Sequence, residues 1–252
     1  MDADRILVIG NIKPHYFAGF AGGRKSLIPG LCDFQTIEQN HSHALSENSR
    51  PMALQGNPVA EDMDAGVRLL KEKPIFSIQT VMGLDHEPAG VFSGNLQTTF
   101  ITGTELAREV YSTPVREKGN IIITANPFPM DINLYQSQHA LENTMNTVED
   151  GGIMILVAKC WDGVGNPAFL DLLDRVDSFS EVKQLISQEG YRLGDHKAYR
   201  MMQLLERVKV WMVSDLDPEL VRRAKMRPFR DLQKAIDEAI VVTRERGREP
   251  HV

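Results

Sequence analysis

The feature that most constrains the fold is a set of three short apolar runs in the second half of the chain. They are NIIITA (120–125), IMILVA (153–158) and VKVWMV (208–213), and segments with helical patterning separate them. Apolar strands that alternate with helices are typical of a parallel sheet covered on both faces. We therefore predict a parallel-sheet α/β domain with helices on both faces over residues 119–252.

The first part of the chain predicts a second α/β unit. Its strands are expected at RILVIG (5–10) and IFSIQTVM (75–82), and the polar segment STPVREKGN (112–120) is typical of a linker. Because the first strand begins almost at the first residue, we expect residues 1–112 to form only part of a larger domain. Further helices are expected at 33–45 and 57–73, begun by the cap residues Asp33 and Asn57, and at 97–111, 131–148, 217–224 and 231–239, with a last strand at 240–243.

Composition excludes several classes of protein. The net charge of −6 argues against nucleic acid as the main partner. The N-terminus lacks the long apolar segment of a signal peptide or membrane span, so we expect no membrane partner. The two cysteines, Cys32 and Cys160, lie far apart and form no disulfide framework. A reducing, cytoplasmic location is therefore expected.

The stretch PHYFAGFAGGRKSLIPG (14–30) concentrates residues that are suited to chemistry. Within it, GFAGGRKS (19–26) nearly matches a phosphate-binding P-loop, but Arg24 stands where the second glycine is needed, and eight residues separate the stretch from the strand. Three interpretations remain: a P-loop, a glycine-rich turn with Arg24 and Lys25 in solvent, or a cofactor-binding loop of another kind.

The helix expected at 33–45 carries two histidines. Phe34, Ile37, His41 and Ala44 share one face at spacings of three and four, so we expect His41 to point inward. His43 lies roughly 200° further round the helix and is expected to face solvent. His41 is then either a metal ligand or a core histidine, and the two histidines cannot share a metal on a regular helix.

At this point the sequence resembles the nickel-dependent lactate racemases and related 2-hydroxy acid racemases. The segments that carry the resemblance are GNIKPHYFAGFAGGRKSLIPG (10–30) and TIEQNH (36–41), with weaker matches at NPVAEDMDAG (57–66), GVFSGN (90–95) and DINLYQ (131–136). The resemblance implies a cytoplasmic isomerase that racemises or epimerises a small 2-hydroxy acid through a nickel-pincer nucleotide, a derivative of pyridinium-3,5-bisthiocarboxylic acid mononucleotide.

The resemblance also implies roles for individual residues. Lys25 would join the cofactor covalently, and Gly22 and Gly23 would let the backbone approach it. His41 would bind nickel, and His15 would be an acid–base histidine. From the second domain, Gln136 would approach the substrate across a cleft between the two units.

The chain departs from the family in two ways. The family's second catalytic histidine and its substrate-binding arginine precede the segment matched here, so we expect the isolated chain to need a missing N-terminal segment, in cis or as a separate chain. A lysine of the lactate enzymes is replaced by His139, which leaves the identity of the 2-hydroxy acid open. Cofactor-maturation enzymes are the other expected partners. The alternative is a non-catalytic, truncated or split-gene module that keeps the cofactor site.

Three further side chains are weaker candidates. His86 and His196 lie next to aspartates and are expected to serve as caps, turns or ion-pair partners. Trp161 follows a predicted strand and could line the cleft.

Overall fold

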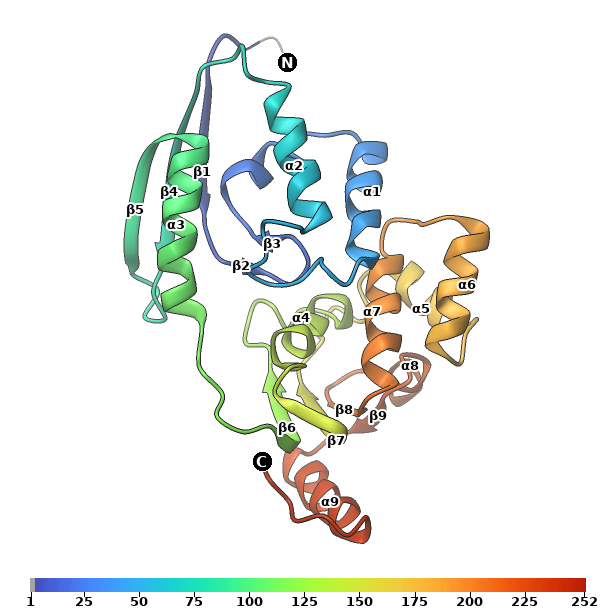
Figure 1. Cartoon of the computed structure of the whole chain (residues 1–252). Helices are drawn as coiled ribbons and strands as arrows, with labels where there is room; N and C mark the ends of the chain where they lie inside the picture. Colours follow the sequence, from blue (N-terminus) through green and yellow to red (C-terminus); the bar gives the residue numbers. More distant parts are fainter. Residues whose placement is uncertain (1–2) are drawn as a thin grey trace. The chain divides into compact units, whose positions relative to one another are not determined.

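A computed structural model describes residues 3–252, and the chain divides into two compact units (Figure 1). Unit 1 ends at Pro114 and unit 2 covers Val115–Val252. The elements of unit 1 are β1 (Ile6–Asn11), β2 (Pro14–His15), β3 (Gly19–Phe20), the 3-10 helix η1 (Gly23–Ser26), α1 (Phe34–Ser42), the 3-10 helix η2 (His43–Leu45), α2 (Pro58–Arg68), β4 (Ile75–Met82), β5 (Pro88–Asn95) and α3 (Leu96–Tyr111).

The main sheet of unit 1 has the order β1-β4-β5. Strand β1 runs parallel to β4, and β4 runs antiparallel to β5. Val8, Leu27 and Leu96 form a buried cluster on the face of the sheet that η1 and α3 cover. The register places four apolar side chains on the opposite face, where they are at least half exposed: Leu7, Ile9, Phe76 and Val91.

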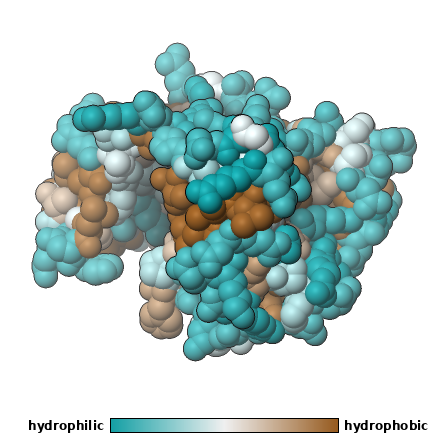
Figure 2. Space-filling model, turned by 90° about the horizontal axis from the view of Figure 1, so that it is seen from below, coloured by the Kyte–Doolittle hydropathy of each residue, from teal (hydrophilic) through white to brown (hydrophobic). Residues whose placement is uncertain are grey.

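Apolar side chains also gather elsewhere on the surface. Figure 2 shows a brown patch surrounded by hydrophilic residues near the middle of the face seen from below. Patches of this kind on soluble proteins often mark contact surfaces.

Unit 2 contains the longer run of helices. Its elements are β6 (Gly119–Ala125), α4 (Leu134–Thr144), β7 (Val148–Val157), α5 (Pro167–Leu173), α6 (Phe179–Glu189), α7 (Asp195–Leu205), β8 (Lys209–Val213), α8 (Pro218–Arg223), β9 (Arg227–Phe229) and α9 (Leu232–Glu245). The strands form one sheet in the order β6-β7-β8-β9, and every neighbouring pair is parallel.

Helices cover both faces of this second sheet. Ile153 and Ile155 of β7 pack with Ala235 of α9. Met154 lies between these two isoleucines along the strand, so it points to the other face, and it is fully buried. On that other face the Thr124 hydroxyl donates to a carbonyl of α4. The predicted fold class, two α/β units with a parallel second sheet, is therefore confirmed.

Local signals placed several boundaries correctly and missed others. Asp33 and Asn57 cap α1 and α2 as predicted. The helix predicted at 131–148 is shorter, because Asn133 caps α4 just before Leu134. The predicted strand at 240–243 is wrong, since these residues continue α9 and pack on the sheet. The last strand is instead β9, a three-residue edge strand with a central proline that the sequence analysis missed.

Cys32 and Cys160 are free cysteines. Across residues 3–252, the search for a helix of sufficient length and apolarity to cross a membrane finds none.

Candidate functional site

The histidine of the glycine-rich stretch lies at the carboxyl end of β1, where ligands commonly bind in α/β sheets. His15 belongs to a small hairpin in which β2 pairs antiparallel with β3, and His15 is the partner of Gly19. The Ala18 N–H donates to His15 Nδ1 over 3.2 Å. The hairpin thus fixes the ring so that Nε2 is the nitrogen available to other groups.

The amine of Lys25 meets that nitrogen. Lys25 lies in η1, and its Nζ is 3.0 Å from His15 Nε2. Burial, followed by the positive charge of Lys13, lowers the pKa of Lys25 to about 8. The predicted pair of histidine and lysine is therefore brought into direct contact, and the interpretation that Lys25 is simply solvated is wrong.

The direction of hydrogen bonding shows which protonation states this contact needs. Because Nδ1 of His15 accepts from Ala18, the proton of the neutral imidazole is on Nε2. Nε2–H must then donate to Lys25, and only an uncharged amine has a lone pair to accept it. The geometry therefore favours Lys25 as a free base, which is the nucleophilic form of lysine.

His41 lies close to this pair. Its ring meets the Phe17 ring edge-to-face at 5.1 Å between centroids, and Phe17 meets the His15 ring at 4.6 Å. Burial, followed by the nearby charge of Lys25, lowers the pKa of His41 to about 4. The imidazole is thus neutral at pH 7, as a metal ligand must be.

The stripe predicted for α1 needs correction. Phe34 is 61% exposed, and the buried residue of the helix is Asn40, whose amide donates to Val59 O and Asp62 on α2. Helix α1 packs on α2 through this polar contact near its C-terminal end, whereas its first turn, with Phe34, is exposed. His43 is half-buried and begins η2, so it lies beyond the end of α1, and the expectation that it faces solvent stays a prediction.

The donor set near His41 suits a metal that is held mainly by another ligand. Among residues 3–252 no cluster of three or more His, Cys, Asp or Glu side chains forms a metal site. The neutral imidazole of His41 and the nearby amine of Lys25 are groups that suit a metal-bearing organic cofactor. The residues present therefore fit a covalently attached, metal-bearing group.

The glycines before Lys25 are required by the protein itself. Gly22 has φ +83°, and a Cβ there would lie 2.7 Å from the Asn11 carbonyl oxygen. Gly23 has φ +52°, and a Cβ there would lie 2.4 Å from the Phe100 ring. These positions admit only glycine because of close packing. Their predicted contact with a cofactor stays a prediction.

The remaining predicted site residues lie in unit 2, on the first turns of α4. Gln136 is half-buried, and its N–H donates to the capping Asn133 side chain over 2.9 Å. His139 is half-buried three residues further on, at a spacing that places both side chains on the same side of the helix. That they share a site with His15, Lys25 and His41 stays a prediction.

A buried lysine that the sequence pattern did not indicate supports this helix. Lys197 of α7 is 1% exposed, donates to the Tyr135 carbonyl over 2.7 Å and lies 4.6 Å from the centroid of its ring. The Gln138 amide donates to the Lys197 carbonyl over 2.8 Å. Sequence offered no signal, because residues 135 and 197 meet only through the packing of α4 against α7.

The weaker candidates take structural or surface positions. His196 is buried, with Nδ1 2.7 Å from the Tyr191 hydroxyl. His86 is exposed in a turn with φ +66°, and Trp161 is 57% exposed.

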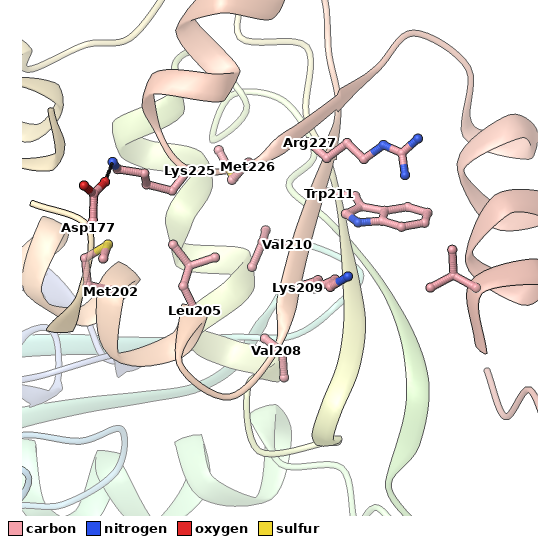
Figure 3. A pocket seen from close by; sticks show the side chains of 11 residues that line it. Asp177, Met202, Leu205, Val208, Lys209, Val210, Trp211, Lys225, Met226 and Arg227 are labelled. Carbon is pink, nitrogen blue, oxygen red and sulfur yellow. Dashed lines mark hydrogen bonds and ion pairs between the residues drawn. The ribbon is translucent and has the colours of Figure 1, made fainter. Parts of the chain in front are cut away.

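A cavity of about 490 Å³ in unit 2 contains none of the predicted site residues (Figure 3). It lies near the amino ends of β8 and β9, away from the carboxyl ends where α/β sites form. Two of its cations already have partners within the wall. Lys225 pairs with Asp177 over 2.7 Å, and Arg227 lies over the Trp211 ring.

Comparison with protein families gives two matches. The lactate racemase C-terminal domain matches residues 115–249, and the lactate racemase N-terminal domain matches residues 1–52. Between them they include every residue assigned above to the candidate site.

Two curated proteins are similar over nearly the whole chain. Lactate racemase from Thermoanaerobacterium thermosaccharolyticum is 32% identical over 94% of this chain, and lactate racemase from Lactiplantibacillus plantarum is 32% identical over 95%. The chain spans 56% of the length of each relative.

Solved structures agree with the fold. The lactate racemase apoprotein from T. thermosaccharolyticum superposes with a TM-score of 0.88 at 30% identity, covering 96% of this chain and 59% of that one. A protein from Thermotoga maritima superposes with a TM-score of 0.71 at 13% identity, covering 93% of this chain and 63% of that one, which shows a shared fold alone.

Proposed function

The chain belongs to the lactate racemase family, and we propose from this that it is the cofactor-bearing part of a racemase or epimerase of small 2-hydroxy acids. The observation that carries the proposal is the contact of Lys25 Nζ with His15 Nε2 at 3.0 Å, with the neutral imidazole of His41 close by. The family's cofactor is a nickel-pincer nucleotide. When bound, this group would supply hydride-transfer chemistry at the α-carbon of the substrate.

The chain's own residues would supply the remaining functions. Lys25 would anchor the cofactor through its amine, and His41 would complete the nickel coordination with a neutral nitrogen, a suitable ligand for that metal. His15 would exchange a proton with the substrate hydroxyl through Nε2, the ring nitrogen that meets the Lys25 amine in this structure. Gln136 and His139 would orient the substrate.

The replacement of the family's lysine by His139 bears on the substrate. A lysine is a compact charge that suits a small carboxylate, whereas an imidazole is planar and titrates near neutral pH. We therefore propose that the substrate is a 2-hydroxy acid other than lactate.

The unit 1 sheet supports a need for the rest of the family's chain. Leu7, Ile9, Phe76 and Val91 expose an apolar face that a longer protein would cover. The chain spans 56% of the length of each curated relative. The alternative to the proposed activity is a non-catalytic module that keeps the cofactor site.

The experiment that tests the function is polarimetry on a panel of enantiopure 2-hydroxy acids. The chain, produced together with the family's cofactor-making enzymes, is measured alone and after addition of the N-terminal part of a lactate racemase. We expect little or no loss of optical rotation by the chain alone and a clear loss once the other part is present. Loss of rotation in neither case would favour the non-catalytic module. Robust turnover by the chain alone would contradict the need for a partner segment.

A further inference from the structure

The turn that carries Lys25 also contains a buried cation, Arg24. Arg24 is 2% exposed, and its Nε lies 2.9 Å from an Asp64 carboxylate oxygen on α2. Its guanidinium carbon is 4.4 Å from the centroid of the Phe100 ring on α3. Burial of a charge is costly unless the charge is paired, so this arrangement is a specific structural feature and not a solvated side chain.

The same turn is held on its other side by β4. The Gly23 N–H donates to Gln79 Oε1 over 2.8 Å, and Gln79 is fully buried. The Arg24 carbonyl accepts from the N–H groups of Leu27 and Ile28 over 3.0 and 2.9 Å, which closes the turn. Contacts to β4, α2 and α3 therefore fix the backbone on both sides of the Lys25 α-carbon.

We infer that Arg24 is a positioning residue for Lys25: its ion pair with Asp64 and its contact with Phe100 hold the turn so that the lysine amine stays against His15 and out of water. The proposed function supplies the role of Lys25 as a cofactor anchor. The positioning itself is a property of unit 1 and is tested without any cofactor.

The physical consequence is a change in the environment of the amine. When the ion pair is broken, the turn can move away from α2 and α3, and the Lys25 amine gains water. Hydration favours the ammonium, so the pKa of Lys25 rises from about 8 toward the ordinary lysine value of about 10.4.

The test is an NMR titration of the Lys25 side chain in the full chain labelled with ¹³C-lysine. The key variant is Asp64→Asn. Loss of a carboxylate lowers a nearby lysine pKa through electrostatics alone, whereas release of the turn raises it. The two explanations therefore predict opposite signs. Arg24→Lys, which keeps the charge but loses the planar group over Phe100, is expected to raise the pKa as well.

We expect the neutral fraction of Lys25 at pH 8 to fall by about tenfold or more in Asp64→Asn and in Arg24→Met. In the variant that combines Asp64→Asn and Arg24→Met, the neutral fraction should fall no further than in the more affected single variant, because both substitutions remove the same contact. Lys197 in unit 2 is the internal reference and should titrate as in the wild type. Phe100→Leu serves as the milder variant if the others fail to fold, and it should move the Lys25 pKa in the same direction.

An unchanged or lowered Lys25 pKa in folded Asp64→Asn would overturn the inference, even if the variant were less stable. This result is distinct from failure of the proposed function, which would appear as a wild-type chain with the predicted Lys25 pKa but no attached cofactor.

Discussion

Each unit contains a lysine whose pKa is lowered by burial, and the two lysines differ in what their amines meet. Lys197 in unit 2 donates to a backbone carbonyl of Tyr135 over 2.7 Å, and the charge of Glu142 favours its protonated form. Lys25 in unit 1 lies 3.0 Å from Nε2 of His15, and a proton on that nitrogen can be accepted only by the uncharged form of the amine.

The difference shows that burial alone does not make a lysine a nucleophile. Burial lowers the pKa of both amines, to about 7 for Lys197 and about 8 for Lys25. Lys197 donates an N–H to the Tyr135 carbonyl, so its amine serves as a structural hydrogen-bond donor to α4. A donor partner, His15, favours the uncharged form of Lys25, and the lone pair of that form would attack a cofactor.

The largest expected effect sharpens the assignment of the metal to unit 1. In chain loaded with cofactor, His41→Ala should lower the nickel content severalfold, since His41 is the neutral imidazole near Lys25. His43→Ala is the matched control, and it should keep nickel because His43 belongs to η2 beyond the end of α1. Elemental analysis of the purified protein measures both. Loss of nickel in the His43 variant alone would reverse the assignment.

A second prediction tests whether the Lys25 turn is rigid. Gly23→Ala should destabilise the chain by about 3 kcal/mol, because its Cβ meets the Phe100 ring at a φ that disfavours side chains. Gly56→Ala is the control: its φ is +74°, but its Cβ would meet nothing within 4 Å, so the cost should be about 1 kcal/mol. Urea unfolding followed by circular dichroism compares the two. Equal losses would mean that the Phe100 contact is soft.

The smallest predicted effect is a pH dependence due to Lys197. Its folded pKa of about 7 lies below the unfolded value, so between them the unfolded chain holds a proton that the folded chain lacks. Stability therefore rises with pH in this window. From pH 7 to pH 9, the wild type should gain about 2 kcal/mol over Lys197→Met.

The readout for this prediction is tryptophan fluorescence in urea, since both tryptophans, Trp161 and Trp211, lie in unit 2. An equal pH slope in wild type and variant would show that Lys197 is hydrated or charged in the folded state.

Local signals explain which parts of the fold the sequence predicted. Cap residues and apolar runs are short-range, so Asp33, Asn57 and the strand at 75–82 were placed correctly. The β-branched run at 240–243 was predicted to be a strand but is helical, because packing against the sheet overrides the strand preference of β-branched residues. The predicted inward position of Phe34 is wrong because α1 contacts α2 through a polar residue, Asn40.

The candidate site was predictable only in its motif residues. His15, Lys25 and His41 lie in one short segment that resembles a known family. Asp64 and Phe100, which contact Arg24, lie 40 and 76 positions from it in the sequence, and nothing in the local pattern of Arg24 indicates burial. Contacts of this range follow from tertiary packing and become visible only in the structure.

The central claim is that Lys25, and not the more deeply buried Lys197, is the covalent anchor of a nucleotide cofactor. The most direct measurement is peptide mass spectrometry on chain produced together with the family's cofactor-making enzymes, with Lys25→Ala as the matched variant. The account predicts added mass on the Lys25 peptide alone and none in the variant. Added mass on the Lys197 peptide, or an equal increase in intact mass of the variant, would contradict it.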